Sequence, residues 1–297
     1  MDSRHPPAEV RVDADLVRGL LESQHPRFLS GEVALVDEGW DNFTYRVGSD
    51  YVVRLPRREA AVQLLLNEQR WLPLISSWIP LAVPVAIGIG VPSPRFRWPW
   101  SVVKWIPGTT AEGLVLSSDD ARVLAESLRS LHRTPPPDAP PNPFRGVPLA
   151  ARRAVVEERF ARSRLTGLDA LWRAALEAPP AETAVWLHGD LHPRNVLVRD
   201  GALGGLIDWG DMTAGDPATD LACAWMLFDA QGRAMFLEAY DPTEDEHARA
   251  MGWAVNFGSA MLDSGHARHA AIGRAIVQQL VDAAEHSYRY RIPPQNL

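Results

Sequence analysis

A short segment, WLHGDLHPRNVLVRDGALGGLIDWGD at residues 186–211, concentrates aspartate, asparagine and histidine around aliphatic runs. Its VLVR and ALGGLI runs flank an Asp-Gly pair, which is a strong signal for a two-residue β-hairpin turn. In that register Asn195 lies opposite Leu206, and Asp208 follows just past the same end of the hairpin. One amide oxygen and one carboxylate are hard ligands that suit Mg²⁺, which takes its remaining ligands from water and phosphate. Asn195 and Asp208 are therefore the candidate metal ligands.

A second candidate carboxylate precedes this hairpin in the loop HGDLHPRN, which Pro193 stiffens. From this loop Asp190 can accept a hydrogen bond from an attacking hydroxyl group without being a primary metal ligand. His188 is expected to pack within the loop, whereas His192 faces the same loop and could contact a substrate. Asp190 is the candidate catalytic residue.

HGDLHPRN followed by IDWGD resembles the catalytic and metal-binding loops of the aminoglycoside phosphotransferases, which are relatives of the protein kinases and of macrolide and choline kinases. The resemblance implies that Asp190 orients the acceptor hydroxyl, and that Asn195 and Asp208 hold the Mg²⁺ that bridges the nucleotide phosphates. The later GDPATDLA is similar to a helix-opening motif of the family, which implies that Asp220 braces the catalytic loop. The implied fold is α+β and protein-kinase-like, with a small β-rich N-lobe and a larger helical C-lobe.

The N-terminal part of the chain reads as short strands around one helix. EVALVDEG, NFTYRVG and YVVRLP combine alternating apolar residues with turn residues, which is typical of an antiparallel meander. EAAVQLLLNEQRWLPLI has apolar residues at helical spacing, and VAIGIG and WSVVKWI continue as strands. We expect residues 1–103 to form a β-rich nucleotide-binding lobe.

Kinase-like folds need a cation from a strand over the phosphates, paired with a glutamate from a helix. Arg54 and Glu68 are the candidates here, with Arg57 as a rival for the phosphate contact. Arginine can neutralise phosphate, although its planar fork differs from the point charge of lysine. In the predicted phosphate-covering loop DEGWDNFTYRV, Asn42 or Thr44 could contact phosphate.

WSVVKWIPG resembles the connection between the lobes in the same family. The resemblance implies that backbone groups near Val103 to Trp105 bind the base of ATP or GTP. Beyond this connection we expect a helical lobe, residues 104–297, with the catalytic loop and the acceptor site. Within it TPPPDAPPNPF cannot form a regular element, so residues 134–148 are a predicted connection long enough to form a wall beside a substrate.

Composition excludes several classes of function. The formal net charge of −7 disfavours nucleic acid as a partner, because such binding depends on neutralising phosphates. The single cysteine, Cys223, rules out an intrachain disulfide and argues against a cysteine-based zinc site. No apolar stretch reaches the roughly 18 residues of a membrane span, and the N-terminus lacks a signal-peptide pattern. We therefore expect a cytoplasmic enzyme without a membrane partner.

These patterns predict Mg²⁺-dependent transfer of the γ-phosphate of ATP or GTP to a hydroxyl of a small molecule. Acids of the helical lobe that line the cleft would attract a cationic acceptor such as an aminoglycoside or related antibiotic, and so indicate a resistance kinase. These acids are Asp211, Asp216, Asp229, Asp241, Glu244, Asp245, Glu246 and Asp263. The alternatives are a metabolic kinase of the choline or homoserine type, a macrolide kinase or a nucleotide-binding pseudokinase. A protein kinase is disfavoured because DWGD and GDPATDLA lie too close together for a long activation segment.

Overall fold

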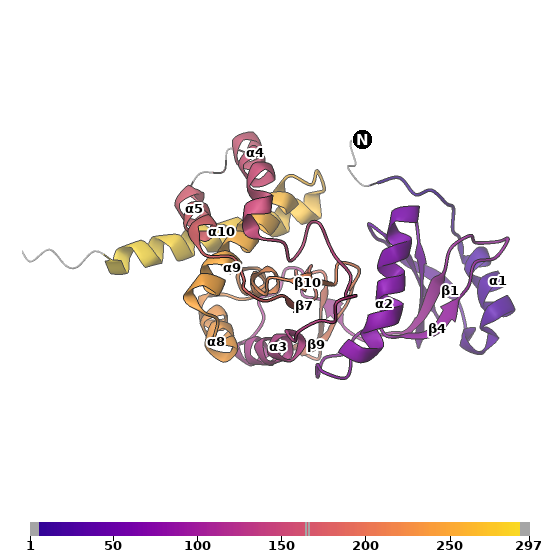
Figure 1. The fold of residues 1–297 in the computed structure, drawn as a ribbon. Coiled ribbons are helices and arrows are strands. Elements are labelled where there is room, and N and C mark those ends of the chain that lie inside the picture. The colour runs from indigo at the N-terminus through magenta and orange to yellow at the C-terminus, as the bar shows by residue number, and fades with distance from the viewer. Residues whose placement is uncertain (1–5, 164, 166, 292–297) are drawn as a thin grey trace, which may run out of the picture. The chain divides into compact units, whose positions relative to one another are not determined.

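The structure is a computed structural model that describes residues 6–163, 165 and 167–291. The described chain forms two compact units, each coloured by position along the chain in Figure 1. The β-rich unit runs to Gly108 and also includes Gly204–Met212, whereas the helical unit comprises Thr109–Leu203 and the chain from Thr213 onward. The β-rich unit thus extends past the boundary that the sequence placed after residue 103. It takes in Gly204–Met212 because the backbone of Ala82 bonds Gly204 and Leu206, at 3.3 and 2.9 Å.

The β-rich unit is built on a five-stranded sheet in the order β1-β2-β3-β5-β4, and each neighbouring pair is antiparallel. Its strands are β1 (Val33–Glu38), β2 (Asn42–Val47), β3 (Tyr51–Pro56), β4 (Ala86–Gly90) and β5 (Trp100–Lys104). The predicted meander and the two later strands are confirmed. The predicted helix is also present, as a 3₁₀ turn (Glu59–Ala61) that leads into α2 (Val62–Ile75).

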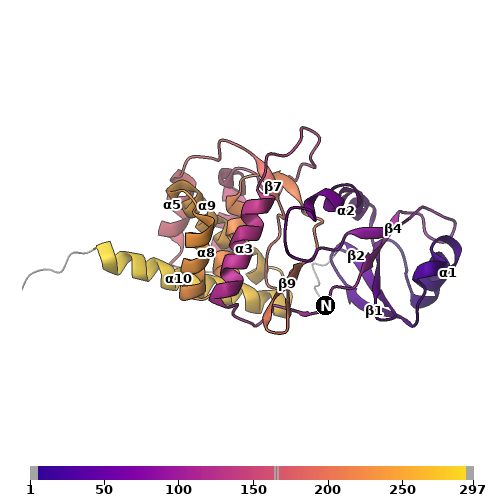
Figure 2. The same cartoon turned by 90° about the horizontal axis from the view of Figure 1, so that it is seen from below.

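A further helix, α1 (Ala14–Gln24), was not predicted from the sequence. Asp13 caps its N-terminus, and its buried residues Val17, Leu20 and Leu21 join an apolar cluster with residues of the sheet. In Figures 1 and 2 this helix and α2 lie on opposite sides of the sheet. A short 3₁₀ turn (Pro26–Phe28) connects α1 toward β1.

The helical unit is organised around α9 (Glu244–Leu262), whose buried face includes Trp253 and Phe257. Among the helices that this helix packs against are α4 (Arg153–Ser163), α5 (Asp169–Glu177), α6 (Ala218–Leu221) and α10 (Ala267–Arg291). The remaining helices are α3 (Ser118–Leu131), α7 (Ala224–Leu227), α8 (Ala230–Tyr240) and the 3₁₀ helix Leu149–Arg152. The segment DPATDLACAWMLFDA forms two short helices, α6 and α7.

Short strands interrupt these helices. They are β6 (Thr109–Thr110), β7 (Val185–Leu187), β8 (Val196–Arg199), β9 (Ala202–Leu206) and β10 (Thr213–Gly215). The predicted hairpin is confirmed, because β8 and β9 are neighbours and the turn residues Asp200 and Gly201 have φ angles of 52° and 80°. β7 pairs with β10, which places the start of the HGD loop at the end of a two-stranded sheet. Within the described residues, no helix is both long and apolar enough to span a membrane.

Candidate active site

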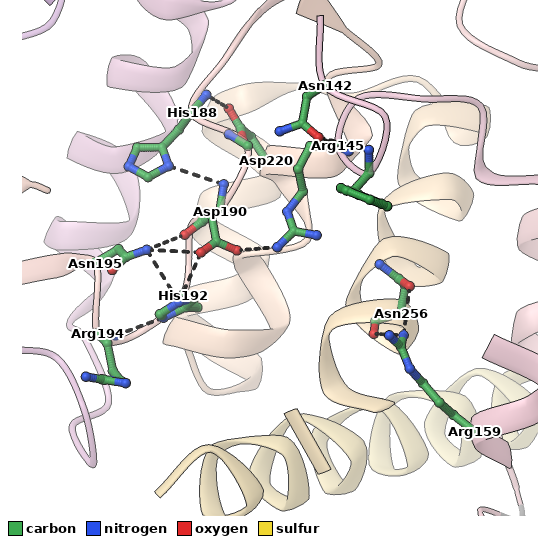
Figure 3. Close-up of polar contacts among 12 residues, drawn as sticks. Asn142, Arg145, Arg159, His188, Asp190, His192, Arg194, Asn195, Asp220 and Asn256 are labelled. Atoms are coloured by element: carbon green, nitrogen blue, oxygen red, sulfur yellow. Dashed lines mark hydrogen bonds and ion pairs between the residues drawn. The ribbon is translucent and has the colours of Figure 1, made fainter. Parts of the chain in front are cut away.

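The loop HGDLHPRN is held from behind by a buried carboxylate. The backbone N–H groups of His188 and Gly189 donate to the two oxygens of Asp220 in α6, each at 2.8 Å. His132 also contacts Asp220, at 3.3 Å, and its other ring nitrogen lies 2.7 Å from the Tyr240 hydroxyl. Asp220 is fully buried, so these contacts satisfy a charge that water does not reach. The bracing role implied by the resemblance is therefore matched by its contacts (Figure 3).

Asp190 follows directly, and both of its carboxylate oxygens contact donors (Figure 3). Oδ1 accepts a hydrogen bond from Arg145 at 2.9 Å, while Oδ2 lies 3.3 Å from both Asn195 Nδ2 and His192 Nε2. The Asp190 side chain keeps 20% of its surface exposed, enough for a hydroxyl group to approach. Burial raises the pKa of Asp190, but the positive charge of Arg145, followed by the contacts with His192, lowers it by more. The net pKa of Asp190 therefore lies below its usual range.

Arg145 is the residue of this site that sequence reasoning missed. It ends the Pro-rich stretch, where the Asn142 side chain accepts the N–H groups of Phe144 and Arg145 and shapes a turn. Its guanidinium lies over the ring of Phe257 in α9, 4.9 Å from the ring centroid. The signal in the sequence was a basic residue within the segment 134–148, which was predicted to be a connection and is long enough to form a wall beside a substrate.

The candidate metal ligands each present an oxygen atom. Asn195 is 5% exposed, and its amide nitrogen donates to the Asp190 carbonyl oxygen at 2.9 Å. Among the described residues nothing donates to its amide oxygen, which is the atom suited to a cation. Asp208 has a left-handed backbone, with φ of 61°, and 58% of its side chain is exposed. Asn195 belongs to the helical unit and Asp208 to the β-rich unit, and both fit Mg²⁺ in ligand chemistry.

Within the β-rich unit, Arg54 of β3 forms a buried ion pair with Glu68 of α2, as the sequence predicted. Arg54 also contacts Asp208, with an Nη2 to Oδ1 distance of 3.3 Å. Burial raises the pKa of Glu68 and Arg54 opposes that shift. The rival Arg57 instead bonds the Gly39 carbonyl at 2.8 Å and Glu38 at 2.6 Å, so it fastens the loop between β1 and β2.

The other residues that were predicted to bind the nucleotide, Asn42, Val103 and Trp105, differ in burial and in hydrogen bonding. Asn42 begins β2 and is 7% exposed, and its buried amide oxygen has no hydrogen bond within the described chain. Val103 lies in β5 between β3 and β4, where Val52 and Ala86 are its partners. The Trp105 N–H donates to Asp50 at 2.7 Å. A nucleobase would therefore have to use other backbone groups of this segment.

The acids expected to give the acceptor cleft a negative field are largely engaged in structural contacts. Asp216 is buried against Arg249 at 2.7 Å, and Asp263 bonds Arg162 at 2.8 Å. The side chains of Asp229 and Glu246 cap the N-termini of α8 and α9. Counting acids along the sequence therefore overestimated the free negative charge, because carboxylates satisfy helix N-termini and buried arginines.

The chain is similar in sequence to a known protein family and to individual proteins. Residues 32–253 match the model of the phosphotransferase enzyme family. Viomycin phosphotransferase of Streptomyces vinaceus is 31% identical over 196 residues, which is 59% of this chain and 67% of that protein. An uncharacterised protein of Bacillus subtilis (strain 168) is 27% identical over 224 residues, which is 65% of this chain and 68% of the other.

Solved structures share the fold. The GDP complex of wild-type aminoglycoside 2'-phosphotransferase-IIIa has a TM-score of 0.64 at 17% identity, covering 92% of this chain and 99% of that chain. Macrolide 2'-phosphotransferase from Brachybacterium faecium has a TM-score of 0.59 at 22% identity, covering 89% and 97%. The predicted α+β, kinase-like fold class is thereby confirmed.

Proposed function

This chain belongs to the phosphotransferase enzyme family, and from that premise we propose that it transfers the γ-phosphate of ATP or GTP to a hydroxyl group of a small molecule, with the help of Mg²⁺. The observation that carries the proposal is the Asp190 carboxylate. It is partly exposed, both of its oxygens are held by donors, and its loop is braced by buried Asp220. A carboxylate fixed in this way can orient a hydroxyl group for attack.

In the proposed reaction, the acceptor oxygen forms a bond to the γ-phosphorus while the bond from that phosphorus to the bridging oxygen of the nucleotide breaks. The nucleoside diphosphate leaves, and the hydroxyl proton departs by way of Asp190. Asn195 and Asp208 would supply oxygen ligands to Mg²⁺, which when bound neutralises charge on the phosphates. His192, 3.3 Å from Asp190, helps to fix the carboxylate.

On the nucleotide side, Arg54 is the proposed phosphate contact, because Glu68 fixes its guanidinium within the β-rich unit. We propose that Asn42, the first residue of β2, contacts the phosphates. Backbone groups of Val103 to Trp105 are proposed to bind the base. We place the reaction in the cytoplasm, where nucleoside triphosphates are available.

Antibiotics are the first acceptors to test, because viomycin, aminoglycoside and macrolide phosphotransferases are among the relatives. An aminoglycoside or related antibiotic as acceptor would make this protein a resistance kinase. The second candidate is a metabolic hydroxy compound, as in kinases of the choline or homoserine type. A specific observation favours an acceptor that is not polycationic: Arg145, which bonds Asp190, has the further positive charges of Arg152 and Arg159 near it in the helical unit.

Thermal unfolding with ATP or GTP, with and without Mg²⁺, tests the proposal. A ligand present at about 100 times its dissociation constant stabilises the folded state by about 2.7 kcal/mol. We expect Mg²⁺-dependent stabilisation by at least one nucleotide, followed by nucleotide consumption when a panel of hydroxyl compounds is added. Asp190→Asn is the matched control, which should keep the stabilisation and lose the turnover. Absence of any nucleotide effect in the unsubstituted protein would contradict the proposed function.

A further inference from the structure

Three arginines of the helical unit, Arg145, Arg152 and Arg159, lie near one another, and one of them, Arg145, contacts Asp190. Arg145 ends the Pro-rich segment, Arg152 ends the 3₁₀ helix that precedes α4, and Arg159 lies on α4. Arg159 Nη1 reaches toward the carbonyl and side-chain oxygens of Asn256 in α9, at 3.5 and 3.3 Å. Figure 3 shows this pair on the same side of Asp190 as Arg145.

The charges of this arginine group are not balanced. Asp190 bonds Arg145, but no carboxylate of the described chain lies within ion-pair distance of Arg152 or Arg159. The nearby Asp263 bonds Arg162, as does Glu158. The arginine group that begins at Arg145 therefore carries an excess of positive charge, which is the opposite of what a polycationic acceptor needs.

Mutual repulsion among these guanidinium groups adds to the cost of burying them. Burial lowers the pKa of Arg152, and the charge of Arg145 lowers it further. The pKa of Arg159 is also lowered, first by burial and then by the charge of Arg152. Arg152 Nε is buried without a hydrogen-bond partner in the described chain. A bound anion would offset the repulsion among the guanidinium groups.

Aromatic rings hold two of these arginines in place. Arg152 lies over Phe144, 5.7 Å from the ring centroid, and Arg145 lies over Phe257 at 4.9 Å. Stacking of this kind orients a guanidinium while leaving its edge donors available. The arrangement is thus suited to binding a planar carboxylate or a phosphate.

We propose that the acceptor is a hydroxy compound carrying a carboxylate or phosphate group, which binds Arg152 and Arg159 while its hydroxyl lies against Asp190. This inference rests on the proposed phosphotransfer and names the acceptor class for the same site. The reaction itself is unchanged: the acceptor hydroxyl takes the γ-phosphoryl group and releases its proton, and the acidic group stays intact as an anchor.

The test is a panel of acceptors matched in all but charge. Each hydroxyl scaffold is offered with an acidic group, with an ammonium group or uncharged, as in gluconate, glucosamine and glucose, or glycerate, 3-amino-1,2-propanediol and glycerol. A charge-assisted hydrogen bond predicts kcat/KM about 10- to 100-fold higher for acidic members than for their uncharged partners. Preference for ammonium members, or rates no higher than the acceptor-free control for every acidic member, would overturn the inference.

Substitutions at Arg152 distinguish a role in binding the acidic acceptor from a role in stabilising the fold. Arg152→Gln is expected to raise KM for the best acidic acceptor about 10-fold while kcat changes by less than about twofold. Arg152→Lys should recover part of the loss, because it restores the charge. Arg153→Gln, at the exposed next residue, which begins α4, removes the same charge and should leave KM unchanged. If Arg152 only braces Phe144, Arg152→Gln will lower the unfolding temperature without changing the preference for acidic acceptors.

Different results would reject the phosphotransferase function and the acidic acceptor. Mg²⁺-dependent stabilisation by nucleotide, together with no phosphorylation of acidic members, would retain the phosphotransferase function and reject the acidic acceptor. Absence of nucleotide binding in the unsubstituted protein would reject both.

Discussion

Asp220 holds the backbone of His188, whose N–H donates to Asp220 Oδ2 at 2.8 Å. The other carboxylate oxygen accepts the Gly189 N–H at the same distance. Gly189 has a φ of 88°, a left-handed conformation that glycine adopts without strain. The direction of the chain at Asp190 therefore depends on a carboxylate supplied by a helix much later in the sequence.

Replacing Asp220 should cost stability and activity together. Asp220→Ala leaves two buried N–H donors without an acceptor, at about 1–3 kcal/mol each. We expect the free energy of unfolding to fall by about 2–5 kcal/mol in urea titrations, with loss of turnover in the same variant. Asp229→Ala, which removes a helix cap in the same unit, should cost about 1 kcal/mol and keep turnover. A fully stable but inactive Asp220 variant would assign this carboxylate a direct catalytic role.

Replacing Asp190 should separate turnover from nucleotide binding. Asp190→Asn keeps the shape of the side chain but removes the charge that orients the hydroxyl. Turnover should fall by about 10²- to 10⁴-fold, the usual range for a positioned acid or base. Nucleotide affinity, measured by calorimetry, should stay within about threefold, because we assign Asp190 no phosphate or metal contact. Retained turnover would move the hydroxyl-orienting role to another residue.

Local signals made some parts of the site predictable. The Asp-Gly turn predicted the hairpin, because the turn needs two residues of positive φ, and Asp200 and Gly201 have them. Arg54 and Glu68 could be paired from sequence because a strand cation followed by a helix glutamate is a spaced pattern, and the pair is present. Their roles toward a nucleotide stay predictions.

Contacts between distant segments were not predictable. Arg145 reaches Asp190 across 45 residues from an irregular loop, and no periodicity specifies where such a loop places a side chain. Helix α1 was missed although Asp13 caps it and Val17, Leu20 and Leu21 recur at helical spacing; the helix is short, and burial against the sheet stabilises it. The acids of the helical lobe were misjudged for a related reason: sequence shows a charge but not its partner.

Replacing Asp208 should remove the Mg²⁺ dependence of nucleotide binding, since it is the only charged ligand that we assign to the metal. Calorimetric titration of Asp208→Asn with ATP or GTP should give the same affinity with and without Mg²⁺. Asp200→Asn is a matched control in the same hairpin. Asp200 is exposed and also has a left-handed backbone, which asparagine tolerates, so this variant should behave as the unsubstituted protein. Unchanged Mg²⁺-nucleotide affinity in Asp208→Asn would show that the hairpin does not supply the metal ligand.

The pH dependence of stability should report on His269, whose Nε2 lies 2.6 Å from Arg194 Nη1. A guanidinium is always a donor, so the ring must accept this bond and remain neutral. Burial, and then the charge of Arg194, lower the pKa of His269 from 6.5 to about 4. Between those values the unfolded chain binds a proton that the folded chain refuses, so the free energy of unfolding falls as pH drops from about 6.5 toward about 4. Above that window His269 contributes no pH dependence.

The effect can be isolated by comparing the unsubstituted protein with His269→Gln, whose amide oxygen can accept the same hydrogen bond without titrating. The slope due to one histidine cannot exceed about 1.4 kcal/mol per pH unit, and partial exposure of the ring reduces it through solvent screening. We expect the difference in free energy of unfolding between the two proteins, from urea titrations at several pH values, to be constant above about pH 7 and to favour His269→Gln increasingly below it. His247, whose pKa burial also lowers, is common to both proteins and cancels in the difference. Parallel stability curves down to about pH 5 would show that the folded state protonates His269 as readily as the unfolded chain does.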